Sequence, residues 1–248
     1  MYWKIVGTNV RMLGSMHLMP SNAGNLPEWV VDAYSWADVV YLESDSRTFA
    51  THMRSQDINK LQSHLSLEVW AALNRLWKSN AALPSLPDVK PWAAALIAPV
   101  LAQPLVNGVE PYFIEQAATQ SKSLRYLETI ADFVAGLESI PIEEAVAALT
   151  ILMADLAEPG RSMKAMHAAW VVRDFAEFAK VVERMAVLRL ANTRRVLLDD
   201  RNRNWVMPIL TALESSAPTL IAVGVLHFWG RNNLLELLGQ HVEIVEID

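Results

Sequence analysis

The pattern Gly-x-x-His occurs twice in this chain, once near each end, and each copy directly follows an apolar run. The first copy ends at His17 and follows residues 10–13, and the second ends at His227 and follows residues 220–223. Short apolar runs that end at a glycine are typical of buried β-strands. Open sheets bind ligands beyond the carboxyl ends of their strands, so we expect both histidines at one sheet edge. The pattern therefore predicts that the two ends of the chain share one sheet and that the histidines share one ion.

Composition narrows the classes of protein that remain. Hydrophobic residues make up 52% of the 248 residues, which is enough for a substantial core in one large domain or two small ones. The chain has no cysteine, so histidine, aspartate and glutamate remain as the metal ligands. With 21 basic and 27 acidic residues and no basic stripe, a nucleic-acid partner is not expected. No basic segment with a long apolar core is present at the start, so we expect a cytoplasmic location.

The most apolar segment spans residues 92–106 and is interrupted by Pro99 and Pro104. Such a segment is too short and too broken for a transmembrane helix, so we predict no membrane span and a buried helix in its place. If the folded chain leaves this segment exposed, it provides a symmetric surface through which the protein can form a homo-oligomer.

The first part of the chain predicts the start of a β-α-β arrangement. Residues 4–6 and 10–14 predict a hairpin, a loop follows His17, residues 27–36 predict a helix, and residues 38–43 predict a buried strand that ends at Glu43. From residue 46 to about 120 the apolar spacing is mostly helical. Residues 124–129 predict another strand near an acid, Glu128, in parallel with Glu43.

The second half of the chain is mostly helical in pattern. A helix is predicted to begin with Ser139 as its cap and Pro141 in its first turn, with Glu143 and Glu144 at the positive end of its dipole. Residues 175–212 predict further helix, interrupted or bent near Pro208. The chain closes with the second motif strand, a helix over 232–238 and a strand over 242–247.

An ordered set of short motifs resembles the TraB/GumN family, whose animal members are the Tiki proteases. Either Gly-x-x-His motif alone is too short to identify a family, but the ordered set is specific. The chain departs from the family at Glu110, where an aspartate is more usual. The matching segments are residues 13–17, the strand reaching Glu43, 90–92, 108–110, 127–129, 200–202, Trp205 and 223–227.

The resemblance covers nearly the whole chain and implies one α/β domain over residues 1–248. It implies a central mixed β-sheet with many surrounding helices, and we expect a mostly helical central insertion at about 46–215. It also implies a metal-dependent hydrolase site built from both Gly-x-x-His motifs and a glutamate. On this basis His17, His227 and Glu43 are the expected metal ligands, Arg201 is expected close to them, and Asn202 is expected to help bind substrate.

The chemistry of these residue types agrees with such a site. Two neutral imidazoles and a carboxylate bind a divalent ion such as Mn, Co or Zn and leave positions open for water and substrate. The ion lowers the pKa of a bound water from about 16 to about 7. Glu128 or Glu110 then accepts the proton of that water, and Arg201 stabilises the oxyanion or binds a substrate carboxylate.

Three functions remain open from the sequence. The leading hypothesis is a metal-dependent hydrolase that acts on a peptide or another small substrate. The second is a non-catalytic peptide-binding, ligand-binding or regulatory protein that keeps the fold. The third is hydrolysis of a non-peptide ester, which a comparison of ester and amide substrates distinguishes from the first.

Overall fold

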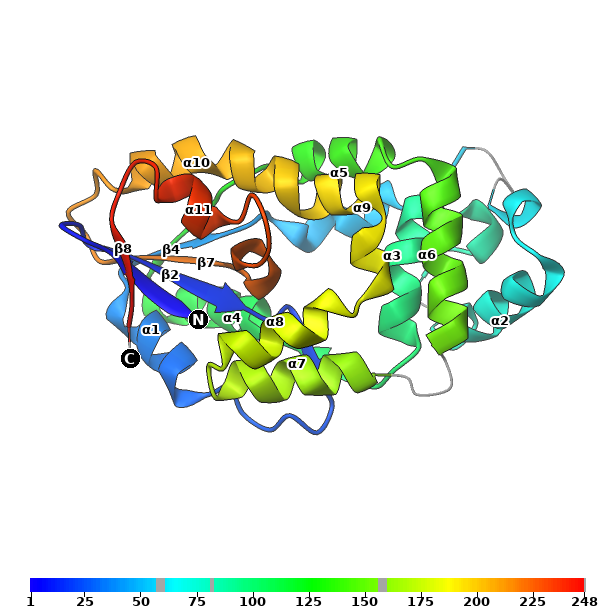
Figure 1. The fold of residues 1–248 in the computed structure, drawn as a ribbon, viewed down its shortest axis with the longest axis horizontal. Coiled ribbons are helices and arrows are strands. Elements are labelled where there is room, and N and C mark those ends of the chain that lie inside the picture. The colour runs from blue at the N-terminus through cyan, green and yellow to red at the C-terminus, as the bar shows by residue number, and fades with distance from the viewer. Residues whose placement is uncertain (57–60, 81–82, 156–159, 248) are drawn as a thin grey trace.

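A computed structural model of the chain describes residues 1–56, 61–80, 83–155 and 160–247 (Figure 1). Within these residues a central sheet of six strands has the spatial order β6-β4-β7-β2-β1-β8. Strands β6, β4, β7 and β2 are parallel, whereas β1 and β8 are antiparallel to their neighbours. The α/β class with a mixed central sheet is therefore confirmed. The strands are β1 (Tyr2–Ile5), β2 (Val10–Ser15), β4 (Val39–Leu42), β6 (Ser123–Tyr126), β7 (Thr219–Gly224) and β8 (Ile244–Glu246).

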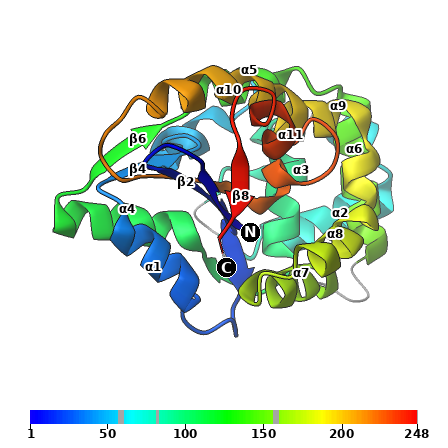
Figure 2. The ribbon, with the colours of Figure 1, turned by 60° about the vertical axis from the view of Figure 1, so that its left-hand side comes forward.

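Strands β2 and β7 lie at the centre because their sequences are apolar. Every residue of β7 and all but one residue of β2 are buried. A continuous apolar run is what a parallel strand needs when helices cover both of its faces. Helices α10 and α11 lie on one side of the sheet, and α1, α4 and α7 lie on the other (Figures 1 and 2). These helices are α1 (Glu28–Trp36), α4 (Val109–Gln120), α7 (Arg161–Val171), α10 (Asp200–Ala212) and α11 (Leu234–Leu238).

The two ends of the chain meet in this sheet, as predicted. Trp3 of β1 pairs with Glu246 of β8, and the amino group of Met1 donates a hydrogen bond to the Glu246 carboxylate at 2.5 Å. Strands β2 and β7 are direct neighbours, with Gly14 opposite Val223. The first and second Gly-x-x-His motifs therefore leave the sheet side by side.

A second apolar core lies at the far end of the molecule from the β1–β8 edge (Figure 1). It is formed largely by α2, α3 and α6, with α5 beside them. The helix predicted in residues 92–106 is confirmed as α3, which buries Trp92 and Ala94. The end of that segment instead forms β5, which pairs with the short strand β3 directly after His17. The bounds are α2 (Leu67–Trp77), α3 (Pro91–Leu101), α5 (Ile130–Glu138), α6 (Ile142–Asp155), β3 (Leu18–Pro20) and β5 (Leu105–Asn107).

Residues 46–215 are mostly helical where the structure describes them. Strand β6 lies within this range and forms one edge of the central sheet. The remaining α-helices of the described range are α8 (Phe175–Glu183) and α9 (Ala191–Arg194). A π-helix (Arg195–Asp199) follows α9 and continues into α10. In the described part of the chain, no helix is both long and apolar enough to cross a membrane.

Three details of the sequence-based expectation are wrong. Ser139 does not cap α6 but ends α5, where its hydroxyl donates to the carbonyl of Gly136. Pro141 disfavours a helical backbone at the residue before it, Ile140. The chain is therefore not helical between α5 and α6, and α6 begins after Pro141. The chain after His17 also forms strand β3 rather than only a loop.

The third error concerns residues 175–212, which do not form one helix bent at Pro208. The interruption precedes α9, whose first turn is capped by the carboxylate of Glu144 through the backbone N–H groups of Asn192 and Thr193. Pro208 lies within α10, which continues to Ala212. The carbonyl that Pro208 leaves without a partner belongs to the exposed Asn204, where water can bond to it.

Candidate active site

The predicted site residues Glu43, His17 and His227 follow three neighbouring strands, β4, β2 and β7, at the same edge of the sheet. In the sheet, Ser15 at the end of β2 lies opposite Gly224 at the end of β7, and β4 lies on the other side of β7. Glu43 directly follows β4, so its carboxylate reaches across to accept a hydrogen bond from the Gly224 N–H at 2.7 Å. The carboxyl edge of the parallel strands therefore holds Glu43 between the two motifs.

The glycine of the second motif is required for this close approach. A Cβ atom at Gly224 would lie 2.9 Å from Nε2 of His17 and 3.2 Å from Oε1 of Glu43. The first distance is shorter than Cβ atoms adopt and the second is tight, so a larger residue would displace the imidazole and press on the carboxylate. Close approach of the backbone to the site is therefore the reason for a glycine at position 224.

His227 is buried and fixed in one orientation. Its Nδ1 lies 2.6 Å from Oδ1 of Asn202, while the Asn202 amide nitrogen donates to the carbonyls of His227 and Asn232. Since the amide nitrogen is the donor, Oδ1 must accept, and the imidazole proton lies on Nδ1. Nε2 therefore presents its lone pair, 3.5 Å from Oε1 of Glu43.

His17 has a similar arrangement but is accessible to solvent. Its Nδ1 lies 3.0 Å from Oε1 of Glu110, and its Nε2 lies 3.3 Å from Oε1 of Glu43. The hydroxyl of Ser15 donates to the same Glu110 oxygen. About half of the His17 side chain is exposed, against 3% of the His227 side chain. His17 thus forms the open side of the site.

Arg201 forms ion pairs with both Glu43 and Glu128. Its Nη2 donates to Oε2 of Glu43 at 2.5 Å, and its Nε donates to Oε1 of Glu128 at 2.9 Å. Its Nη1 lies 3.4 Å from Nε2 of His227 and has no carboxylate partner among the described residues. We refer to His17, Glu43, Glu128, Arg201 and His227 as the site cluster.

Aromatic rings hold the guanidinium and one imidazole in place. The Arg201 guanidinium lies 4.4 Å from the Phe133 ring centre and 4.5 Å from the Trp205 ring centre. The Trp205 ring also packs against His227 at 4.5 Å. Trp205 is fully buried. Cation–π contact and packing therefore restrict Arg201 and His227 together.

The pKa values of the two histidines move in opposite directions. Burial lowers the pKa of His227 to about 3, so its imidazole is neutral near pH 7. The pKa of His17 rises well above its ordinary value because the carboxylates of Glu110 and Glu43 outweigh the effect of desolvation. This arrangement favours a neutral His227 and a protonated His17, and a metal ion bound at Nε2 of His17 would displace that proton.

The two carboxyl groups also differ. Burial alone would raise the pKa of Glu43, but the charges of Arg201 and the imidazoles hold it well below its ordinary value. The pKa of Glu128 is raised because burial outweighs its contact with Arg201. Glu43 is therefore a permanent anion, and Glu128 is the more easily protonated of the two.

The side chains of the cluster are of the types that bind a divalent ion, but they are not placed around a common point where an ion would fit. Both Nδ1 atoms are bonded to other side chains, as in metal-binding histidines, and both Nε2 atoms face Glu43. However, no three His, Asp or Glu side chains in the described ranges are grouped so as to hold a metal ion. Arg201 and the Gly224 N–H already occupy both oxygens of Glu43.

All seven residues named for the site from the sequence, Glu110 included, lie in or against this cluster. Asn202 is 1% exposed and bonds to His227, so its predicted contact with substrate stays a prediction, and its position favours orienting the imidazole. The sequence analysis did not identify Ser15 or Phe133. Ser15 lies within the first motif, which is the one signal that points to it, whereas Phe133 has none.

Of three comparisons with known proteins, the one against family models found a match. A search of curated proteins and a search of solved structures each found no match. The model of the TraB/PrgY/gumN family matches residues 1–246. Because that match spans essentially the whole chain, including both Gly-x-x-His motifs, this chain belongs to the TraB/PrgY/gumN family.

Proposed function

We propose that this chain is a metal-dependent hydrolase that cleaves a peptide bond. One observation supports the proposal above all: Nε2 of His17 and Nε2 of His227 approach the same Glu43 oxygen, at 3.3 and 3.5 Å. A carboxylate and two facing imidazoles with strongly shifted pKa values are more frequent at functional sites than elsewhere in proteins. The peptide bond as the substrate rests on the resemblance to the Tiki proteases.

His17, Glu43 and His227 would hold the ion, and Mn, Co and Zn all suit this donor set. When bound, the ion would supply a water of lowered pKa as the nucleophile. The protein prepares for it by committing Nδ1 of His227 to Asn202 and Nδ1 of His17 to Glu110. These contacts fix which nitrogen each ring presents.

Glu128 and Arg201 have distinct roles in this proposal. Glu128 is a buried carboxyl group with a raised pKa, which suits a group that takes up and releases a proton. Arg201 has one nitrogen, Nη1, without a carboxylate partner. That nitrogen is the donor left for a substrate oxygen, where its charge would stabilise a developing oxyanion. Substrate would enter on the exposed side of His17.

The first test is the metal content of protein purified without an affinity tag or chelator, by elemental mass spectrometry. We expect stoichiometric metal in the wild type and its loss in a folded His17→Ala, His227→Ala double variant. His241→Ala, at an exposed histidine outside the cluster, serves as the control. Absence of metal binding even after reconstitution with Mn, Co and Zn would contradict the proposal.

The second test is turnover of a peptide library by the metal-loaded protein. We expect hydrolysis by the wild type and its loss in Glu43→Gln, because the neutral amide removes the anionic donor between the imidazoles. A folded Glu43→Gln protein with unchanged turnover would exclude Glu43 from the reaction.

One observation favours the second candidate, a non-catalytic peptide-binding or ligand-binding protein. The Arg201 guanidinium already compensates Glu43 and Glu128, so the cluster is stable in charge without an ion. Saturable peptide binding without turnover, unaffected by metal, would favour this candidate over the hydrolase.

A further inference from the structure

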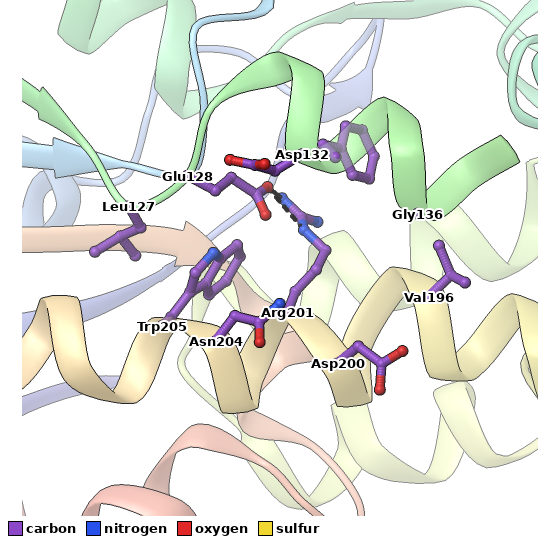
Figure 3. Close-up of a pocket in the computed structure, with 10 residues that line it drawn as sticks. Leu127, Glu128, Asp132, Gly136, Val196, Asp200, Arg201, Asn204 and Trp205 are labelled. Atoms are coloured by element: carbon purple, nitrogen blue, oxygen red, sulfur yellow. Dashed lines mark hydrogen bonds and ion pairs between the residues drawn. The ribbon is translucent and has the colours of Figure 1, made fainter. Parts of the chain in front are cut away.

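A cavity of about 310 Å³ adjoins the site cluster between α5 and α10, as Figure 3 shows. Glu128, Arg201 and Trp205 belong to its wall and also to the site or its packing. Through Nη1 of Arg201, the cavity wall is 3.4 Å from Nε2 of His227. Only the Arg201 guanidinium would therefore separate a group bound in this cavity from His227 of the site cluster.

The charges on the wall are mostly negative. Three carboxylates, Glu128, Asp132 and Asp200, line the cavity, against one guanidinium, Arg201. Asp200 is neutralised by ion pairs with Arg195 and Arg203. The other two carboxylates are not, because Arg201 divides its charge between Glu128 and Glu43.

One carboxylate oxygen of the wall, Oδ1 of Asp132, remains open to a ligand. Oε1 of Glu128 accepts both hydrogen bonds from Arg201, and Oδ2 of Asp132 accepts from the hydroxyl of Thr129. Glu128 is also faced by the indole N–H of Trp205, whereas Oδ1 of Asp132 accepts no hydrogen bond from the residues that the structure describes. Both side chains belong to the same part of the wall, beside the guanidinium (Figure 3). This negative charge would repel an anion and attract a cation.

The rest of the wall is apolar. Leu127 and Val196 are at least nine-tenths buried, and the partly buried ring of Phe133 stands beside them. Such a wall suits the methylene chain of a long side chain whose charged end meets the carboxylates. A cation without an apolar stem would leave this surface unused.

We propose that the cavity is a subsite for a basic side chain, lysine or arginine, of the peptide substrate, and that Asp132 determines this specificity. The role of this subsite in selecting a substrate for hydrolysis rests on the proposed function. Binding of a basic side chain is nevertheless measurable without turnover, which separates a failure of this proposal from a failure of the hydrolase proposal.

The test uses three blocked tripeptides that differ only in a central lysine, norleucine or glutamate. Their dissociation constants for the metal-free full chain are measured by ligand-observed NMR. We expect the wild type to bind the lysine peptide about fivefold more tightly than the norleucine peptide, the effect of one partly exposed ion pair. The glutamate peptide should bind most weakly.

Two substitutions at one exposed residue make the test specific. Asp132→Asn should bring the lysine-to-norleucine ratio close to one, and Asp132→Lys should make the glutamate peptide the preferred ligand. Asp32→Asn, at an exposed position of α1, is the matched control and should leave the ratio unchanged. Wild-type protein without a lysine preference, or either Asp132 variant that keeps it, would overturn the proposal.

The same peptides are then compared as substrates of the metal-loaded wild type. A lysine preference in both binding and kcat/KM supports the subsite and the hydrolase together. Lysine-selective binding without any hydrolysis supports the subsite and contradicts the hydrolase. Hydrolysis that ignores the central residue contradicts the subsite alone.

Discussion

At the scale of single residues, the partner of Nδ1 determines the orientation and the basicity of each imidazole. His227 is oriented by the neutral amide of Asn202, and His17 by the carboxylate of Glu110. The carboxylate makes His17 the more basic of the two rings, and a more basic imidazole is a better metal ligand once its proton is displaced. Glu110 is therefore a positioning residue of the proposed site. Its Oε1 atom accepts from the Ser15 hydroxyl and faces Nδ1 of His17, which fixes the carboxylate against the ring.

We predict that Glu110→Gln weakens metal binding by about 10-fold to 100-fold, the usual effect of losing such a partner. The amide keeps the shape but not the charge, so His17 becomes a poorer ligand. Affinity is measured by competition with a chelator. Glu110→Asp, the residue more usual in the family, should bind the ion more tightly than Glu110→Gln. The exposed Glu115→Gln on the same helix is the control, and equal affinities for all variants would exclude this role.

Arg201 provides a second prediction at this scale. Removing the guanidinium leaves Glu43 and Glu128 buried without their cation, so Arg201→Gln should lower the free energy of unfolding by about 3–5 kcal/mol. Excess divalent ion should restore more stability to Arg201→Gln than it adds to the wild type, because the ion no longer competes with a fixed positive charge. The measurement is the shift of Tm with metal concentration. Smaller metal-induced shifts in Arg201→Gln than in the wild type would contradict this account. Arg201→Lys keeps the charge but not the planar donor set, so it should fall between the wild type and Arg201→Gln.

At the scale of elements, the site depends on how α9 and α10 begin. The carboxylate of Glu144, from α6, accepts hydrogen bonds from the backbone and side chains of both Asn192 and Thr193. This contact caps α9, and the helical segment that follows carries Arg201. A π-helix between α9 and α10 changes the helical register just before Arg201, a feature often found at functional sites.

We predict that Glu144→Gln lowers the free energy of unfolding by about 1–2 kcal/mol at pH 7, as for other lost helix caps. The hydrogen bonds hold the pKa of Glu144 below its ordinary value against the effect of burial. Its charge therefore stabilises the fold fully above the unfolded-state pKa, about 4.3, and the contribution is lost as the pH falls through the lower folded-state pKa. Urea unfolding at pH 7 and at pH 3 checks this. A difference between wild type and Glu144→Gln that persists unchanged at pH 3 would show that charge is not the cause.

The elements also show what a sequence can and cannot predict. Strands β2, β4 and β7 were predictable because short apolar runs bounded by glycine or an acid have few alternatives. The convergence of His17, His227 and Glu43 followed from those strand ends and from the family resemblance. The cap by Glu144 and the contact of Phe133 with Arg201 were not predictable, because each joins residues far apart in the chain. The π-helix has no sequence signal that distinguishes it from α-helix.

At the scale of the whole molecule, the site lies where two apolar cores meet. The first core surrounds the central sheet, and the second lies among α2, α3, α5 and α6. Val196 belongs to the second core and Leu198 to the first, and both lie in the π-helix that precedes Arg201. The segment that positions the guanidinium is therefore held from both sides, and disturbing either core should disturb the site.

A substitution remote from the site tests this coupling. Leu149 in α6 is fully buried in the second core, so Leu149→Ala should lower the free energy of unfolding by about 2–5 kcal/mol. If the cores unfold together, tryptophan fluorescence and far-ultraviolet circular dichroism will give one coincident transition for both the wild type and Leu149→Ala. Ile221→Ala, in β7 of the first core, should shift that same transition by a similar amount. Separate transitions, with Leu149→Ala affecting only one, would instead show that the π-helix does not couple the cores. The position of Arg201 would then depend on the sheet core alone.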